Sequence, residues 1–463
     1  MGSRHVTGEI AALRTDALER EPCGSRVPKG CQRDAVAETG SDEHGLKAAR
    51  LSWLERSLDH PEAHRDARVE LHLARHPAGR GRADDAVGLT ERAVEVHPEP
   101  LPPHDPALTL DGEVASLLLR AEAALDRLDL ASEMVPSVGW FLYSFVRKEA
   151  VISSHIEGTQ ATLMDLFAYE AAGKAESSET DDVQEVCNYL DAIACARKQV
   201  KSPKGLPISV RHLCETHRRL MKGVRGAEKI PGEIRRSQNW IGGTRPGNAA
   251  YVPPPPHAVG ELLTGLEHFI HGESELPPLR RAGLCHAQFE TIHPYHDGNG
   301  RIGRLLIALL LEHWKLLREP LLYLSLFFKR HRAEYYRRLD GVRGQGDFEG
   351  WLAFFLEGHA VVAEEAVGTI QDLFNLITSD RAKVLSAKTT SVTAARLFEL
   401  LPENPVVTIG RVVNLLSTTK PTANKAVSAL VDAGVLVETT GRRRDRTFGY
   451  AAYLDRLRAG TEI

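Results

Sequence analysis

Apolar residues recur at helical spacing through most of the central chain. In residues 114–130 they fall on one face of a helix, and residues 141–172 continue the same pattern. Helical patterns dominate as far as about Leu376. We therefore expect a mainly α fold in which these helices turn their apolar faces toward a common core.

One stretch within this helical region has a different character. Residues 237–256 contain Gly242, Gly243, Pro246 and Gly247, and a run of prolines begins at Pro253. Glycine and proline favour turns, so the stretch predicts a β-hairpin or flap on the helical bundle.

After Asp380 the pattern changes again. Helical stretches at 393–401, 409–416 and 420–433 precede an alternating run at 435–450, whose turn carries Gly441 and a series of arginines. Three helices followed by a hairpin is the order of a winged helix. The sequence thus predicts a small C-terminal winged-helix (α+β) domain.

The first part of the chain is poor in large apolar residues. Residues 1–100 are rich in Arg, His, Asp, Ala and Gly, and the segment 75–85 carries almost no large apolar side chain. We expect a poorly ordered extension. Short helical patterns at 46–58 and 69–73 leave a small helical appendage as the alternative. The proline-rich residues 98–106 are expected to link this part to the folded region.

Composition narrows the class of protein. The chain has 463 residues, of which 26% are charged and 42% apolar, typical of globular proteins and unlike collagen, coiled coils or disordered chains. The formal net charge of −4 means that any DNA contact must be local. The longest apolar stretch, 302–311, is broken by Gly303 and Arg304, and no secretion signal opens the chain. We expect a cytoplasmic protein that spans no membrane, with reduced cysteines that carry no chemistry.

Residues 293–304 read HPYHDGNGRIGR and precede a strongly apolar stretch. The Gly298-Asn299-Gly300 turn allows the backbone to bend around an anion, and the following helix directs its N–H groups and dipole at the same point. Arg301 and Arg304 are three residues apart and share a helix face, where two guanidinium groups can hold adjacent phosphates. The segment predicts a polyphosphate site.

Two further side chains give this segment catalytic potential. Asp297 supplies a hard oxygen ligand of the kind that Mg²⁺ uses when it bridges a carboxylate and substrate phosphates. His293 lies just upstream, and a neutral imidazole near its unperturbed pKa is a suitable general base at pH 7. No GxxxxGK[ST] or GxGxxG motif occurs, which argues against a P-loop ATPase or a Rossmann dehydrogenase.

The segment resembles the Fic family motif HxFx(D/E)GN(G/K)RxxR, with Tyr295 where the family usually has Phe. The resemblance covers roughly residues 101–358. It implies a helical bundle with a hairpin flap that transfers AMP from ATP to a hydroxyl of a target protein. By this resemblance His293 deprotonates the attacking hydroxyl and Asp297 holds Mg²⁺. The remaining motif residues would form the anion hole (Gly298, Asn299, Gly300) and grip the β- and γ-phosphates (Arg301, Arg304).

A second motif supports the resemblance. Residues 153–158, SSHIEG, are similar to the family's inhibitory helix, (S/T)xxxE(G/N), with Ser153, Glu157 and Gly158 at its defining positions. Ser153 and Glu157 are four apart and share a helix face. In Fic proteins this glutamate pairs with the second motif arginine, here Arg304, and excludes the γ-phosphate. One guanidinium cannot serve a carboxylate and a phosphate at once, so we expect auto-inhibition.

The resemblance assigns two more segments. Residues 232–256 are similar to the family's flap, which would align a target segment by backbone pairing. Residues 327–339 fall where the family places a helix that closes the nucleotide pocket, and Tyr336 is our prediction for the adenine contact. The alternative for Tyr336 is a core role, since aromatic pairs on helices are usually core.

The expected domains are an N-terminal extension (1–100), a helical Fic N-terminal region (101–204), the Fic catalytic core (205–360), a helical connector (361–384) and the winged helix (385–455). The third winged-helix helix opens with Lys420 and Lys425, and the wing carries Arg442, Arg443, Arg444 and Arg446. Both DNA binding and protein contact or dimerisation fit these residues equally.

The function that these residues favour is transfer of AMP from Mg²⁺-ATP to a Ser, Thr or Tyr hydroxyl of a target protein. A nucleotide-sensing transcriptional regulator that binds DNA through the winged helix is the alternative. A third reading keeps the fold but transfers UMP or phosphate. The sequence leaves open the target, whether the chain is a homodimer, what displaces Glu157 and whether the site also removes AMP.

Overall fold

A computed structural model describes residues 98–104, 107–135, 137–173, 181–442 and 444–462. The chain divides into two units, Met1–Gly88 and Leu89–Ile463, and every described residue belongs to the second. The expectation of a poorly ordered extension over residues 1–100 therefore lies almost wholly outside the described residues.

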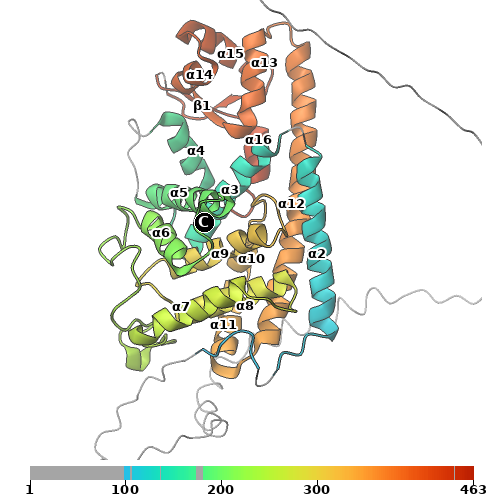
Figure 1. Cartoon of the computed structure of the whole chain (residues 1–463). Coiled ribbons are helices and arrows are strands. Elements are labelled where there is room, and N and C mark those ends of the chain that lie inside the picture. The colour runs from blue at the N-terminus through green and yellow to red at the C-terminus, as the bar shows by residue number, and fades with distance from the viewer. Residues whose placement is uncertain (1–97, 105–106, 136, 174–180, 443, 463) are drawn as a thin grey trace, which may run out of the picture. The chain divides into compact units, whose positions relative to one another are not determined.

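The described chain is mainly helical, which confirms the expected fold class (Figure 1). The first group of elements comprises α2 (Gly112–Glu133), α3 (Val138–Ile156), α4 (Leu163–Ala172), α5 (Asp181–Lys201), α6 (Val210–Leu220), η1 (Pro246–Asn248), α7 (Pro256–His271), α8 (Pro278–Ile292), α9 (Asn299–His313), α10 (Ser325–Arg330), α11 (Arg332–Gln345) and α12 (Phe348–Ser386). The second comprises α13 (Val392–Leu400), η2 (Leu401–Glu403), β1 (Val406–Thr408), α14 (Ile409–Leu416), α15 (Lys420–Asp432), β2 (Val437–Glu438), β3 (Thr447–Gly449) and α16 (Ala451–Leu457).

Two buried helices frame the predicted phosphate segment. Every residue of α8 from Leu279 to Ile292 is buried, and α9 packs against it with most of its residues buried. A helix that is buried on all sides lies inside the core, although α8 also carries polar residues such as His286 and Glu290. The loop 293–298 joins these two helices, so its ends are held by the most rigid part of the fold.

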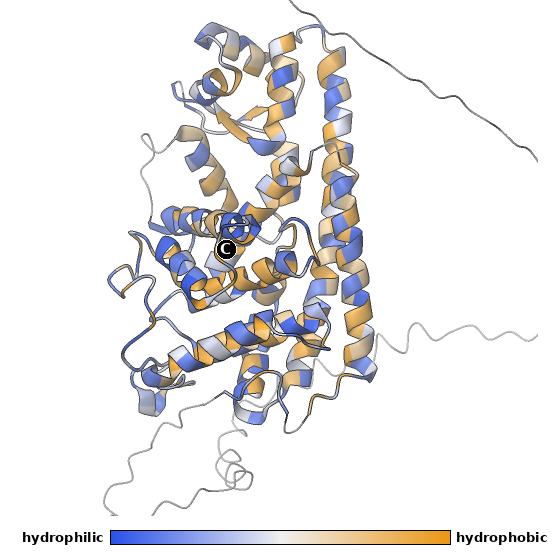
Figure 2. Ribbon diagram, viewed as in Figure 1, coloured by the Kyte–Doolittle hydropathy of each residue, from blue (hydrophilic) through white to orange (hydrophobic). Residues whose placement is uncertain are grey.

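The long helices α2 and α12 lie side by side (Figure 1). In Figure 2 apolar and polar residues alternate along both, as expected for helices that bury one stripe. The expected connector, 361–384, is the second half of α12, so one continuous helix extends from the helical bundle into the C-terminal region.

The single helical run expected over 141–172 is divided into α3 and α4. Gly158 adopts a positive φ of 96° just after α3, a conformation that glycine tolerates best. Thr162 then begins α4 with a capping box, in which its side chain and that of Asp165 each accept a backbone N–H of the other. These local signals override the continuous apolar pattern.

The expected flap folds back on itself at one point. Ile241 and Tyr251 form an isolated antiparallel bridge with two backbone hydrogen bonds of 2.9 and 3.1 Å. The Tyr251 ring is buried, and its hydroxyl donates to the carbonyl of Thr291 on α8. The base of the flap is thus attached to α8 beside the loop 293–298, while Trp240, the residue before Ile241, is exposed.

The C-terminal helices α13, α14 and α15 and the β2–β3 hairpin come in the expected order. The structure adds a strand that the sequence did not predict, β1 between α13 and α14, and this strand completes a three-stranded antiparallel sheet of order β1-β3-β2, in which Val406 pairs with Gly449 and Glu438 with Phe448. The last two strands and their arginine-bearing turn correspond to the predicted wing.

The winged helix is joined to the helical bundle through buried polar contacts. Tyr453 of α16 is completely buried; its hydroxyl lies 3.1 Å from Ser144 Oγ of α3 and donates to the carbonyls of Trp140 and Pro402. Tyr450 donates to Asp380 of α12 at 2.8 Å.

Among the described residues no helix is long and apolar enough to cross a membrane.

We predict that Tyr453→Phe lowers the free energy of unfolding by about 1–3 kcal/mol, because it leaves buried acceptors without their donor while keeping the ring. Urea unfolding followed by circular dichroism measures the change. Tyr336→Phe, at an exposed ring, serves as the control and is expected to change stability little. Equal stability of both variants would show that the Tyr453 hydroxyl does not fasten α16 to α3.

Candidate active site

The loop between α8 and α9 is shaped by two left-handed residues. His293 has φ 49° and ends α8, with its N–H bonded to the carbonyl of Phe289 at 2.9 Å. Gly298 has φ 75° and precedes α9. A left-handed histidine is uncommon and is held here by Arg235, whose Nε donates to the His293 carbonyl at 2.9 Å.

Asn299 closes this loop with two hydrogen bonds to one residue. Its Oδ1 accepts the Tyr295 N–H and its Nδ2 donates to the Tyr295 carbonyl, both at 2.8 Å, and both residues are buried. The Asn299 amide is therefore occupied in holding the loop. An anion at this point would meet the backbone N–H groups at the start of α9, which have no carbonyl partner within the helix.

His217 of α6 contacts two residues of the loop, Tyr295 and Asp297. Its ring stacks on Tyr295 at a centroid distance of 3.9 Å. Its Nδ1 accepts the Gly232 N–H at 2.8 Å, which assigns the proton to Nε2, and Nε2 donates to the Asp297 carbonyl at 3.0 Å. Burial lowers the pKa of His217 to about 4. This imidazole is therefore neutral at pH 7, and it holds the Gly232 N–H and the Asp297 carbonyl through its two ring nitrogens.

His293 is also neutral at physiological pH. Burial, helped by the nearby guanidinium groups of Arg343 and Arg235, lowers its pKa to about 3. His293 is half-buried, and its Nδ1 is buried without a hydrogen-bond partner among the described residues. The imidazole is therefore free of a proton at pH 7, but a pKa of about 3 makes it a weaker base than the near-neutral imidazole expected from the sequence.

Asp297 points its carboxylate toward several cations. Its Oδ2 lies 3.0 Å from Lys229 Nζ, and its Oδ1 accepts the Gly298 N–H at 2.7 Å. Burial alone would raise its pKa, but the contact with Lys229 and the Gly298 N–H lower it overall. The group is an ionised carboxylate, the state that a metal ligand needs.

Arg304 is buried against the predicted inhibitory helix. Its Nε donates to Ser153 Oγ and its Nη2 to the Ser153 carbonyl, each at 2.9 Å. Nη2 also lies 2.7 Å from Glu157 Oε1. Gly300 leaves the space that this carboxylate fills, because a Cβ at this position would overlap Glu157 Oε1. The structure thus brings Ser153, Glu157 and Arg304 together; Gly158 follows them at the turn.

Arg301 turns toward a different partner. Its guanidinium is 3% exposed; Nη1 donates to Glu185 of α5 at 3.1 Å and Nη2 to Met221 Sδ at 3.5 Å. The two motif arginines share a helix face, as their spacing predicts, but their guanidinium groups have separate acidic partners in this state.

Comparison with known proteins agrees with this geometry. Residues 115–198 match the family model described as the Fic/DOC family N-terminal region, and residues 207–311 match the Fic/DOC family model. This part of the chain belongs to the Fic/DOC family. The predicted resemblance is confirmed.

The curated relatives carry one name. The chain is 28% identical over 273 residues to "Protein adenylyltransferase Fic" of Culex quinquefasciatus, covering 55% of this chain and 50% of that protein. It is 33% identical over 154 residues to the protein of that name from Drosophila virilis, covering 33% of this chain and 28% of that one. The chain thus spans half or less of the length of these two relatives.

Solved structures with similarity to this chain include Fic proteins. One is a Fic family protein from Desulfovibrio desulfuricans G20, 21% identical with a TM-score of 0.49, covering 74% of this chain and 97% of that one. Another is Fic-1 (residues 134–508) from C. elegans, 23% identical with a TM-score of 0.44, covering 56% of this chain and 72% of that one.

Tyr336, the predicted adenine contact, lies on α11 with 39% of its surface exposed. Burial of its hydroxyl and the nearby Glu157 carboxylate raise its pKa. Its neighbour Tyr335 is the buried member of the pair, with its hydroxyl 2.9 Å from His286 Nε2. The core alternative therefore describes Tyr335, whereas Tyr336 presents an open ring beside Glu157.

Sequence reasoning missed four residues that hold the Fic motif in place. They lie on α5 (Glu185), α6 (His217) and α11 (Arg343) and near the start of the segment 232–256 that resembles the flap (Arg235). Arg343 donates to the Glu290 carbonyl at 3.0 Å and lies over the Tyr251 ring at 4.0 Å. A charged residue at an otherwise apolar helical position was the only signal, and it does not identify a partner.

Glu290 is an unusual buried carboxyl one helical turn before His293. It is 6% exposed, and its Oε1 is buried without a hydrogen-bond partner among the described residues. Burial raises its pKa from 4.5 to about 7, although Arg304 and Arg343 oppose the shift. Between pH 4.5 and about pH 7, the folded protein keeps a proton on Glu290 that the unfolded chain releases. The free energy of unfolding therefore falls as pH rises through this window.

We therefore predict that Glu290→Gln stabilises the protein at pH 8 more than at pH 5. The gain relative to the wild type should grow by about 2–3 kcal/mol between these pH values, because one pKa unit corresponds to about 1.4 kcal/mol. Urea unfolding at the two pH values measures it. Glu261→Gln, at an exposed position on α7, is the control. A gain independent of pH would mean that Glu290 is ionised in the folded protein.

Proposed function

We propose that the protein transfers AMP from ATP to a Ser, Thr or Tyr hydroxyl of a target protein, and that Glu157 restrains this activity. The observation that carries the proposal is the arrangement around the loop 293–298: a neutral His293 ends α8, the open N-terminus of α9 follows the loop, and Arg304 lies in the second turn of α9 bonded to Glu157. The name shared by the curated relatives supports the same reaction.

The proposed chemistry assigns each group a role. The target oxygen attacks the α-phosphorus, His293 accepts the proton of that hydroxyl, and the bond to the bridging oxygen breaks so that pyrophosphate leaves. The α9 N–H groups stabilise the anionic phosphates through fixed dipoles. Arg301 and Arg304 would neutralise the leaving pyrophosphate. Tyr336 would stack on the adenine.

The residues present fit a magnesium ion held mainly by the substrate. Among the described residues no group of three or more His, Cys, Asp or Glu side chains is arranged to hold a metal. Asp297 alone offers an ionised carboxylate, and Mg²⁺ typically takes one or two carboxylates plus phosphate oxygens and water. When bound, Mg²⁺ would supply charge neutralisation at the phosphates. Asp297 would exchange its contact with Lys229 for this ligand.

Restraint by Glu157 follows from a shared hydrogen-bond donor. Arg304 Nη2 serves Glu157 Oε1, and a γ-phosphate held by this nitrogen must displace the carboxylate. Glu157 lies at the end of α3 with 31% of its side chain exposed, so it can leave without opening the core. Ser153 keeps its two bonds to Arg304 in either state.

We predict that Glu157→Gly raises AMP transfer at least tenfold over the wild type, and that adding His293→Ala abolishes it. Removal of the competing carboxylate frees Arg304 for the phosphate, whereas the second change removes the base. The measurement is incorporation of label from α-labelled ATP into the protein itself or into lysate proteins, in the presence of Mg²⁺.

Parallel incubation with γ-labelled ATP separates AMP transfer from phosphate transfer, and α-labelled UTP tests transfer of UMP. Equal labelling by the wild type and Glu157→Gly would refute the inhibitory role and leave the catalytic one intact. Absence of His293-dependent label in every variant would refute the transfer reaction.

Exposure of the winged helix favours a second candidate function, in which this domain binds DNA. The outward face of α15, including Pro421, Lys425 and Ser428, is exposed, and its helix packs mainly on α13 and α14. Arg442, Arg444 and Arg446 on the wing are exposed as well. A helix in the major groove with a basic wing on the phosphates would need no change in the fold.

If this domain binds duplex DNA, replacing Arg442, Arg444 and Arg446 together by Ala should weaken binding and reduce the salt slope by about 2–3, because each phosphate contact contributes about 0.9. Fluorescence anisotropy with a labelled duplex at several salt concentrations measures both. An unchanged slope would exclude the wing from any DNA contact.

A further inference from the structure

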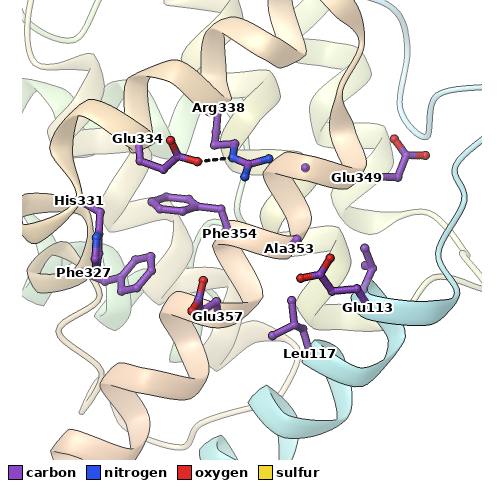
Figure 3. A pocket seen from close by; sticks show the side chains of 12 residues that line it. Glu113, Leu117, Phe327, His331, Glu334, Arg338, Glu349, Ala353, Phe354 and Glu357 are labelled. Carbon is purple, nitrogen blue, oxygen red and sulfur yellow. Dashed lines mark hydrogen bonds and ion pairs between the residues drawn. The ribbon is translucent and has the colours of Figure 1, made fainter. Parts of the chain in front are cut away.

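A cavity lies apart from the Fic motif, between α2, the α10–α11 junction and α12 (Figure 3). Its volume is about 350 Å³, within the range of small-molecule sites. Neither His293, Arg304, Glu157 nor Tyr336 lines it. Its lining residues come from α2 (Glu113, Val114, Leu117), the junction (Phe327, His331), α11 (Glu334, Arg338) and α12 (Glu349, Gly350, Ala353, Phe354, Glu357).

The base of the cavity is aromatic. Phe327 and Phe354 are 4% and 6% exposed, with ring centroids 4.9 Å apart. The His331 ring lies against Phe327 at 4.4 Å. Leu117 of α2 adds an apolar wall. Such a surface suits methylene groups, and aromatic faces also attract cations.

The rim of the cavity is acidic. Four carboxylates line it with one guanidinium, Arg338, which Glu334 already engages at 2.6 Å. Glu349 accepts the backbone N–H of Thr109 at 2.7 Å. This charge balance repels phosphates and carboxylates and favours a ligand that carries positive charge.

Two of the carboxylates are available to a ligand. Glu113 and Glu357 have no hydrogen bond or ion pair among the described residues, and both face the cavity from different helices (Figure 3). Arg120, a guanidinium close enough to interact with Glu357, is bonded to Glu364 at 2.9 Å. Two separate acceptors over an apolar base match a flexible chain with a cation at each end.

We propose that this cavity binds a linear aliphatic polyamine, with one ammonium group at Glu113, another at Glu357 and the methylene chain over Phe327 and Phe354. The ammonium groups form charge-assisted hydrogen bonds with the two carboxylates. The limited volume selects a small ligand over a peptide segment. This binding does not depend on the proposed AMP transfer.

The test is titration calorimetry of the full chain with spermidine at low salt and without nucleotide. We expect saturable binding with one site per chain. Replacing Glu113 and Glu357 together by Gln should weaken it at least tenfold, and Ala353→Leu, which fills the cavity without changing charge, should weaken it similarly. Glu261→Gln on α7 removes a negative charge away from the cavity and should bind as the wild type does. Thermal melting verifies that each variant is folded.

A shorter monoamine, n-butylamine, should bind at least tenfold more weakly than spermidine, because it reaches only one carboxylate. Absence of saturable spermidine binding, equal binding by the double Gln variant, or equal binding of butylamine and spermidine would each overturn the proposal. Because no outcome uses nucleotide, failure of AMP transfer would leave this result unaffected.

Discussion

The need to pair a buried guanidinium organises the Fic site. Arg304 is almost fully removed from solvent, and a charge in such a place must have acceptors. Ser153 provides two of them from the body of α3, and Glu157 provides the third from its end. The first two hold α3 against α9 whatever occupies the third position. In the proposed exchange of the Glu157 carboxylate for a phosphate, only this third contact of Arg304 changes, and its charge keeps acceptors throughout.

Much of the fold and the site follows from local pattern. Helical periodicity predicted the bundle, and the boundaries of α14 agree with the apolar run that defined it. The break between α3 and α4 was missed because Gly158 and Thr162 interrupt an apolar pattern without changing its period. Spacing placed Arg301 and Arg304 on one face, but it could not reveal that Glu185 faces Arg301, since that contact joins helices far apart in sequence.

The helix α3 connects three parts of the described chain. Near its start Ser144 meets Tyr453 of the C-terminal domain, and at its end Glu157 meets Arg304. His155, close to that end, lies 3.1 Å from Lys329 Nζ, and this lysine also donates to the carbonyl of Glu462. The C-terminal region therefore contacts α3 directly near its start and, through Lys329 of α10, near its end.

The continuity of α12 limits how this architecture can be divided or recombined. Its 39 residues correspond to about 58 Å of helix, and the buried positions along it include Ile370, Leu373 and Ile377 in the expected connector. A gene fusion or deletion that breaks the chain at residue 360 would leave these side chains without their packing partners. The Fic region and the C-terminal domain are thus expected to be inherited together as one unit, even though each has a recognisable fold of its own.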